Sequence, residues 1–252
     1  MNRILFERGE IGEGGVAAFG GERAAHVLDI LHGEPGQILK TGEIGGRRGT
    51  AEILSISGGV VTVRVRHDCE APPPWADLIL APPRPRILKR LLPQLAAMGA
   101  GRIVLAGAKK VEKDFWGATL LKEENYRPLL VDGLMQAGAT ALPKIETRRN
   151  FRKFVAEELD KMFPGSMRIV AHPAKDGGSA SSLPAGGGRP LVAIGPEGGW
   201  LDEEVELLES KGFARFSLGE RILKTETAAI ALLAVVSQAV RDRSSRIREG
   251  LR

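Results

Sequence analysis

Cysteine is almost absent from this sequence of 252 residues. Cys69 is the only one, which excludes an internal disulfide and any zinc site built from clustered cysteines. Long apolar runs are also missing, because the longest, Ala228–Val236, is far shorter than the roughly 20 residues that a membrane-spanning helix needs. The charged N-terminal residues do not resemble a signal peptide. We therefore expect a cytoplasmic protein with no membrane partner.

Several motifs that carry chemistry are absent as well. The sequence has no Walker motif, no zinc-protease helix and no serine-nucleophile elbow. Its four histidines lack metal-ligand spacing, so no metal is expected. Gly12–Ala17 matches the dinucleotide pattern G-x-G-x-x-A, but it lies in a β-rich region and no convincing helix opens there. A dinucleotide-dependent enzyme therefore remains only an alternative.

The charge is basic, with a formal net charge of +5 and a pI of about 9.5. A basic balance favours a polyanionic partner through neutralisation of phosphates. A solvated basic surface explains the same numbers equally well. The charge thus permits RNA binding without establishing it.

The first seventy residues read as mostly β structure. Gln37–Glu43, Gly49–Ser57 and Val60–His67 alternate apolar and polar residues, which predicts strands. Glu22–His32 has helical spacing. We expect a small β-barrel over residues 1–71, ended by the three prolines Pro72–Pro74, which cannot join a regular ladder.

Beyond the prolines, short apolar runs alternate with amphipathic stretches, which predicts a largely parallel sheet with helices on both faces. The predicted strands are Asp77–Ala81, Arg102–Ala106, Met167–Ala171, Pro190–Ile194 and Ala214–Leu218. The predicted helices are Ile87–Met98, Lys122–Ala137, Phe151–Leu159, Asp202–Lys211 and a last helix from about Thr225 into the 240s. Ser179–Ser182 and Gly186–Gly188 predict a surface loop. Ligands of such sheets bind beyond the carboxyl ends of the strands.

Unusual residues follow three of these strands, beginning with His172-Pro173 after the first. The second strand runs into Gly195–Trp200, where glycines leave backbone groups uncovered for a flat ligand. Asp202 is expected to cap the next helix, and the carboxylates there favour a neutral or cationic ligand over a phosphate. An ordinary tight turn is the alternative.

The third segment places charges beside an apolar helix. Arg221, Lys224 and Glu226 precede Ala228–Val236, which is apolar on every face. Such a helix must be buried all round, so we expect it to pack on its own sheet and against a second subunit. Thr225 or Thr227 can cap it.

Gly195-Pro196-Glu197-Gly198-Gly199, followed by Leu218-Gly219-x-Arg221-Ile222-Leu223-Lys224-Thr225-Glu226-Thr227-Ala228, resembles the ribosomal RNA small-subunit methyltransferase E family. These knotted SPOUT enzymes methylate N3 of a uridine in 16S rRNA. The resemblance implies a PUA-like RNA-binding barrel over residues 1–71 and a SPOUT domain with a C-terminal trefoil knot over residues 75–252. It also implies S-adenosylmethionine as cofactor, 16S rRNA or the small ribosomal subunit as partner, and a homodimer through the knotted region.

The resemblance also implies roles for individual residues. Cofactor contacts are expected from His172, Pro173, Ile194, Gly195, Pro196, Glu197, Gly198, Gly199, Leu218, Gly219, Ile222, Leu223 and Thr225. We hypothesise that Arg221 and Lys224 hold the base and stabilise charge on its oxygens, while Glu226 orients them, accepts the proton or caps the helix. RNA docking is expected at Arg3, Arg47, Arg48, Arg64 and Arg66 of the barrel.

The sequence departs from the family pattern at several positions. Lys224 stands where the family usually has arginine, and Met135–Ala139 replaces a Glu-Gln-x-Gly-Arg stretch. Ala97–Gly99 and His32 differ too. The cofactor motifs are intact, so the reaction class is better supported than the nucleotide. A different RNA target and a non-catalytic RNA-binding protein remain alternatives.

Overall fold

The computed structural model describes residues 3–173, 184 and 188–250, the last seven of them by their backbone alone. The chain divides into two compact units, residues 1–73 with 127–142, and residues 74–126 with 143–252. The assignment of RNA binding to residues 1–71 and of methyl transfer to residues 75–252 stays a prediction. The loop expected at Ser179–Ser182 and Gly186–Gly188 lies outside the described residues except for Gly188.

The first unit is built on a five-stranded mixed sheet. Its strands are β1 (Ile4–Phe6), β2 (Val16–Phe19), β3 (Ile38–Glu43), β4 (Arg48–Ser57) and β5 (Val60–Cys69), in the order β1-β3-β4-β5-β2. The β1–β3 pair is parallel and the other pairs are antiparallel. A short helix, α1 (Gly21–Ala25), continues into a helical turn over His26–Ile30. The three predicted strands are present, but in the described chain the ladder leaves β1 and β2 as edges, so a closed barrel stays a proposal.

The first unit is completed by residues far along the chain. All but the first four residues of α3 (Glu123–Ala137) and the segment after it, up to residue 142, belong to this unit. The backbone N–H of Arg3 donates to the Met135 carbonyl (3.1 Å), and that of Gly45 donates to the Thr140 carbonyl (2.7 Å). The Thr140 hydroxyl, which is buried, donates to the Gly46 carbonyl (2.8 Å). The unit is therefore discontinuous in sequence.

The second unit contains a six-stranded sheet in which every pair is parallel. Its strands are β6 (Ala76–Leu80), β7 (Ala100–Ala106), β8 (Lys144–Arg148), β9 (Met167–Ala171), β10 (Pro190–Ile194) and β11 (Ala214–Phe216). Their order is β11-β9-β10-β6-β7-β8. The predicted parallel sheet is confirmed. Strand β8 was not predicted, because its residues are mostly polar and it lies at the edge.

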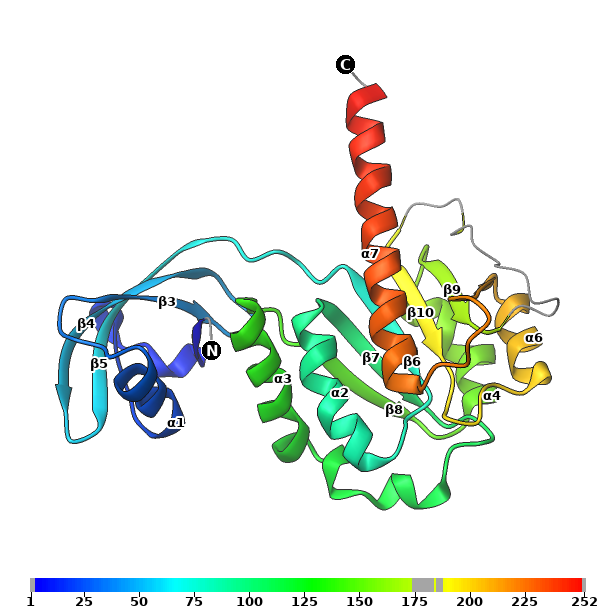
Figure 1. Cartoon of the computed structure of the whole chain (residues 1–252), viewed down its shortest axis with the longest axis horizontal. Coiled ribbons are helices and arrows are strands. Elements are labelled where there is room, and N and C mark those ends of the chain that lie inside the picture. Colours follow the sequence, from blue (N-terminus) through cyan, green and yellow to red (C-terminus); the bar gives the residue numbers. More distant parts are fainter. Residues whose placement is uncertain (1–2, 174–183, 185–187, 251–252) are drawn as a thin grey trace. The chain divides into compact units, whose positions relative to one another are not determined.

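Helices cover both faces of this sheet (Figure 1). Ile79, Val104 and Leu191 belong to a core shared with α4 (Phe151–Lys153), α5 (Leu159–Met162) and α6 (Asp202–Ser210). The alternate residues of the same strands, such as Leu78, face the opposite way. That second face packs against α2 (Pro85–Ala97) and α7 (Thr225–Gly250). The two-layer burial explains why the central strands read as continuous apolar runs.

Helix α7 is only partly covered by this chain. Ala229, Leu232, Leu233 and Val236 are buried, whereas the side chain of Val235 is 41% exposed. The sequence predicted that Ala228–Val236 is buried on every side. In the structure of a single chain, the face that carries Val235 is exposed to solvent. A second subunit would supply the missing cover, and that homodimer stays a proposal.

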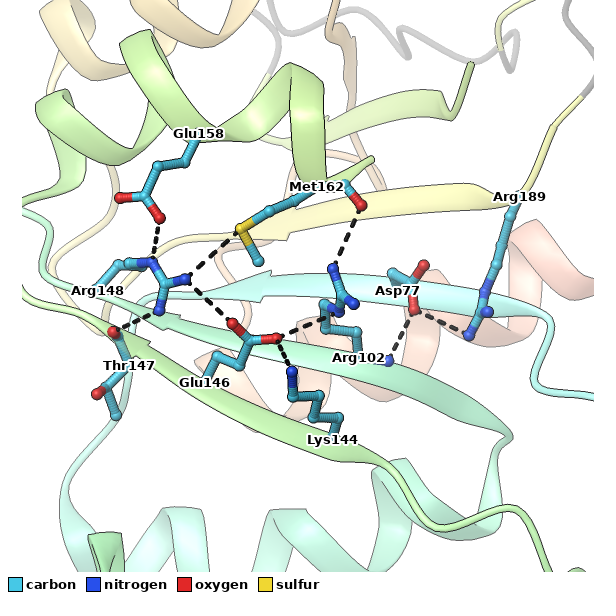
Figure 2. A network of polar contacts seen from close by, with 9 residues as sticks. All are labelled: Asp77, Arg102, Lys144, Glu146, Thr147, Arg148, Glu158, Met162 and Arg189. Atoms are coloured by element: carbon cyan, nitrogen blue, oxygen red, sulfur yellow. Dashed lines mark hydrogen bonds and ion pairs between the residues drawn. The ribbon is translucent and has the colours of Figure 1, made fainter. Parts of the chain in front are cut away.

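A network of ion pairs crosses β6, β7 and β8 on one face of the sheet (Figure 2). Glu146 on β8 pairs with Lys144 and Arg148, each at 3.1 Å, and with Arg102 at 3.4 Å. Burial of the carboxyl raises its pKa, but the hydrogen bond to Lys144 and the three positive charges outweigh this and lower the pKa of Glu146 below 4.5. Ion pairs, more than apolar packing, therefore hold the edge strand β8 in place.

We expect Glu146→Gln to lower the free energy of unfolding by about 1.5–3 kcal/mol at pH 7, because hydrogen bonds to charged groups have this strength. A lowered folded-state pKa gives stability that is full above about pH 4.5 and is lost as the pH falls through the lowered value. The difference between wild type and variant should therefore shrink as the pH falls below about 4.5. Urea unfolding at pH 7 and at a series of lower pH values measures it, with the exposed neighbour Glu157→Gln as control. A difference independent of pH would refute the assignment.

Candidate functional site

Three loops meet at the carboxyl edge of the second unit's sheet. They follow β9, β10 and β11, which are adjacent parallel strands. The His172 N–H donates to the Phe216 carbonyl (3.1 Å), which ties the first loop to the third. The Thr225 hydroxyl, which is buried, donates to the Gly195 carbonyl (3.2 Å) and so joins the start of α7 to the second loop. The strand ends singled out in the sequence therefore form one site.

The loops enclose a pocket with a cavity volume of about 130 Å³, and the pocket is open to solvent on one side. Its lining residues are Ala171, His172, Pro173, Ile194, Gly195, Pro196, Glu197, Gly199, Trp200, Phe216, Ser217, Leu218, Gly219, Arg221, Ile222, Leu223, Thr225 and Ala228.

Twelve of the thirteen residues predicted to contact a cofactor line this pocket. Gly198 does not; its carbonyl instead accepts a hydrogen bond from the Lys110 ammonium (2.7 Å). Of the three residues predicted to be catalytic, Arg221 lines the pocket, whereas Lys224 and Glu226 lie outside its lining. Whether these residues bind a cofactor or act in catalysis stays a prediction.

Sequence reasoning missed five lining residues: Ala171, Trp200, Phe216, Ser217 and Ala228. Four of them lie directly beside a motif residue and Phe216 lies two residues before Leu218, so nearness in sequence was the available signal. Trp200 is the most consequential of them, because its ring lies against Gly195 and packs on Phe151 with centroids 5.1 Å apart. In the part of the chain that the structure describes, its buried Nε1 has no hydrogen-bond partner.

The glycine loop requires glycine at two positions for different reasons. A Cβ on Gly195 would lie 3.1 Å from both Cδ1 and Nε1 of Trp200. Gly199 has a φ of +71°, in the left-handed region that other residues rarely adopt. The loop can therefore bring bare backbone against a bound molecule.

The cap of helix α6 differs from the prediction. Leu201 is the N-cap, and Asp202 is the first helical residue. Glu204, whose side chain is buried, accepts hydrogen bonds from the backbone N–H of Leu201 (2.9 Å) and of Lys109 (2.8 Å). Glutamate at this third helical position is the usual partner in a capping box. Glu204 thus fixes the glycine loop to the loop that follows β7.

The loop after β11 carries the exposed charges of the site. Gly219 has a φ of +109°, and the Ser217 hydroxyl accepts from its N–H at 3.3 Å. Ile222 is 91% exposed, and the side chains of Arg221 and Lys224 are exposed as well. Among the described residues, neither cation forms an ion pair. Both charges are therefore available to an incoming substrate.

The arginines predicted to dock RNA belong to the first unit, and they differ in environment. Arg3 is half-buried and donates to the carbonyls of Thr41, Gly49 and Gly138, so its guanidinium holds the unit together. Arg47 pairs with Glu70 (2.7 Å) and Arg66 with Asp68 (3.3 Å). Arg48 is half-buried and Arg64 is exposed. RNA binding by these side chains stays a prediction.

The composition of the pocket fits a flat, partly cationic ligand. Apolar walls come from residues such as Ile194, Leu218 and Leu223, and glycines supply uncovered backbone groups. Glu197 and Arg221 are its charged side chains. An aromatic ring can lie between the loops while an ammonium or sulfonium group is stabilised by the Glu197 carboxylate.

Among the described residues, no group of three or more histidine, cysteine, aspartate or glutamate side chains could hold a metal ion. None of the helices in the described part of the chain has the length and apolarity that crossing a membrane requires.

Known proteins with similar sequences are RNA methyltransferases. Residues 70–237 match the family described as RNA methyltransferase domain. The ribosomal RNA small subunit methyltransferase E of Treponema pallidum is 33% identical over 245 residues, covering 94% of this chain and 90% of that protein. The protein of the same name from Bacillus subtilis is 23% identical over 94% of this chain and 96% of its own length.

Solved structures share the fold. A ribosomal RNA small subunit methyltransferase E from Neisseria gonorrhoeae, bound to S-adenosylmethionine, superposes with a TM-score of 0.75 at 19% identity, covering 95% of this chain and 98% of that chain. A methyltransferase from Legionella pneumophila in complex with the same cofactor has a TM-score of 0.74 at 25% identity, with 94% and 97% covered.

Proposed function

This chain belongs to the RNA methyltransferase family, and on that premise we propose that it transfers a methyl group from S-adenosylmethionine to the RNA of the small ribosomal subunit. The observation that carries the proposal is the pocket formed by the three strand-end loops, whose walls suit this cofactor. When bound, S-adenosylmethionine supplies an electrophilic methyl group on a sulfonium.

In this proposal the residues of the pocket bind and orient the cofactor. The glycine loop, Gly195 to Gly199, and the loop Leu218–Leu223 lie against its rings, and His172 and Pro173 bound the third side. Glu197 balances its positive charge or holds its amino group or ribose. The protein's main task is alignment of donor and acceptor, because methyl transfer from a sulfonium is an in-line displacement.

The proposed acceptor is N3 of a uridine in 16S rRNA, as the family resemblance implies. This nitrogen faces the pairing partner in a duplex, so the uridine must be unpaired or flipped out. Arg221 lines the pocket and is placed to stabilise charge that develops on the base oxygens. Lys224 and Glu226 lie outside the lining, where they hold the base and orient the cations or take up the proton.

The proposal extends to the architecture. The parallel sheet corresponds to a SPOUT domain with a C-terminal trefoil knot, and the mixed sheet of the first unit to a PUA-like domain that docks RNA. A cytoplasmic homodimer would cover the exposed face of α7, including Val235, and the exposed Ile222. Both side chains are large and apolar, which supports an apolar partner surface.

The direct test incubates the purified protein with labelled S-adenosylmethionine and small ribosomal subunits that lack the modification. Mass spectrometry of the nucleosides identifies the product, and we expect 3-methyluridine. Another methylated nucleoside would support methyl transfer to RNA but would show that the target is not N3 of a uridine. Cofactor binding without methyl transfer would refute the small subunit as the acceptor and point to a different acceptor or a missing partner. Failure to bind S-adenosylmethionine would refute the proposed reaction and favour a non-catalytic RNA-binding protein.

A further inference from the structure

The loops that follow β7 and β8 are fastened to each other at the carboxyl edge of the second unit's sheet. The backbone N–H of Gly107 donates to the Arg148 carbonyl (2.8 Å). A Cβ on Gly107 would clash with the carbonyl oxygen of Arg149, so this close approach requires glycine. The Arg149 guanidinium in turn donates to the Trp116 carbonyl at 3.3 Å. These contacts hold Arg149 against the loop that follows β7.

Trp116 and Arg149 form a pair that we call the platform. The guanidinium carbon of Arg149 lies over the indole ring, 5.8 Å from its centroid, which is a cation–π contact. Trp116 packs on the buried Phe115, edge to face, with ring centroids 5.2 Å apart. Arg149 is exposed, so the side of its guanidinium away from the indole faces solvent. The platform thus presents a planar cation whose position is fixed by an aromatic ring.

The loops that carry the platform are basic. Residues 149–153 include three cations and no acid, and residues 107–117 include three cations and two acids. One of these acids, Glu112, is paired with Arg84 at 3.2 Å. Among the described residues, Arg149 forms no ion pair, so its charge is not neutralised within the chain. A surface of this kind attracts a polyanion.

The platform is connected to the cofactor pocket through the loop that follows β7. The Lys110 ammonium donates to the Gly198 carbonyl (2.7 Å), and the Lys109 N–H donates to the Glu204 carboxylate (2.8 Å). The glycine loop and the platform are therefore held by the same segment. In the sheet order β8 lies three strands from β10, which is about 14 Å at the usual strand spacing. This separation is short enough for one RNA strand to contact both sites.

We propose that the platform binds an unpaired base of the substrate RNA near the target, stacked on the Arg149 guanidinium, with Lys109 and Lys113 contacting adjacent phosphates. Both lysines are exposed and form no ion pair among the described residues. RNA-binding proteins commonly stack splayed bases on aromatic rings or guanidinium planes. Such stacking tolerates any sequence, because every base has a π-face. The inference rests on the proposed function, because it takes RNA as the methyl acceptor.

The test compares two arginines that lie three residues apart. Arg149 belongs to the platform, whereas the exposed Arg152 is already paired with Glu203. With saturating S-adenosylmethionine, we expect Arg149→Met to raise about tenfold the concentration of small subunits that gives half-maximal methyl transfer, as loss of one stacked base implies. The maximal rate should not change. Arg152→Met should stay within about twofold of wild type, as surface substitutions usually do.

Arg149→Lys separates stacking from charge, because lysine keeps the charge but has no planar group. We expect this variant to resemble Arg149→Met. Recovery of the wild-type value by lysine would overturn the stacked base, as would equal values for Arg149→Met and Arg152→Met. Calorimetric titration with S-adenosylmethionine should give all three variants the wild-type affinity. A loss of cofactor affinity in Arg149→Met would overturn the proposal and assign Arg149 to the shape of the cofactor pocket.

A second readout does not depend on turnover. Filter binding measures the affinity of each variant for labelled 16S rRNA in the presence of S-adenosylhomocysteine. A tenfold loss for Arg149→Met but not for Arg152→Met supports the platform even if wild type transfers no methyl group, which would refute only the proposed function. Unchanged affinity in Arg149→Met, or no binding of RNA by wild type, overturns the platform. Methyl transfer by wild type would still uphold the proposed function in that case.

Discussion

Replacing Gly195 with valine is expected to weaken binding of S-adenosylmethionine by about a hundredfold or more, which corresponds to about 2.7 kcal/mol, and to abolish methyl transfer. Even a Cβ at this position would lie 3.1 Å from two ring atoms of Trp200 and 3.2 Å from its backbone nitrogen. The ring cannot retreat easily, because Trp200 is 5% exposed and packs on Phe151. The branched side chain must therefore displace the loop.

Displacement of the loop would also move the Gly195 carbonyl away from the Thr225 hydroxyl, so both walls of the pocket would shift. Isothermal titration with the cofactor measures the effect. Gly117→Val is the control, because Gly117 is exposed and a Cβ there has no atom within 4 Å. Circular dichroism must show that both variants are folded. Cofactor affinity that survives in Gly195→Val would show that the glycine loop does not form the binding wall.

Arg221→Gln is expected to lower the rate constant of methyl transfer about a hundredfold to a thousandfold, with the cofactor affinity changed only slightly. A preorganised donor aimed at developing charge has an effect of this size when it is removed. Arg221 lines the pocket, is exposed and forms no ion pair among the described residues, so its charge is not neutralised within the chain.

Single-turnover kinetics on small subunits separate the chemical step from binding for this variant. Arg86→Gln serves as control, because Arg86 is an exposed arginine of α2 that lies outside the lining of the cofactor pocket. Full activity of Arg221→Gln would exclude the assigned role. A large fall in cofactor affinity with unchanged chemistry would make Arg221 a binding residue instead.

The buried strands were the most predictable part of the fold. β9 and β10 have the limits expected from the sequence, because strands covered on both faces are continuous apolar runs. Strand β8 was not predicted. Lys144–Arg148 is held by ion pairs, and its sequence shows no apolar pattern that would indicate a strand. Whether the first sheet closes into a barrel could not be predicted from the sequence either. The alternation of apolar and polar residues shows which face of a strand each residue occupies, but not which strands pair.

The site was predictable where it is contiguous in sequence. The two motifs and His172-Pro173 supply most of the cofactor pocket, and their strand-end position directed attention to them. Another pocket in the same unit, lined by Pro82–Pro85, Lys110, Phe115 and part of the glycine loop, was not predictable in this way. The proximity of these residues depends on the strand order β10-β6-β7. The structural role of Arg3 was also not predictable from the sequence. Its hydrogen-bond partner Gly138 is distant along the chain and lies near it only because residues 127–142 return to the first unit.

The discontinuity of the first unit has a consequence for synthesis of the protein. The mixed sheet has been translated by residue 73, but the carbonyls that satisfy Arg3 and Gly45 come from Met135, Gly138 and Thr140. A ribosome adds about 5–20 residues per second, so the nascent sheet waits roughly 3–14 s for residue 142 to be added. During that interval the β1 edge lacks its stabilising segment, and strand edges in this state are open to pairing with other chains.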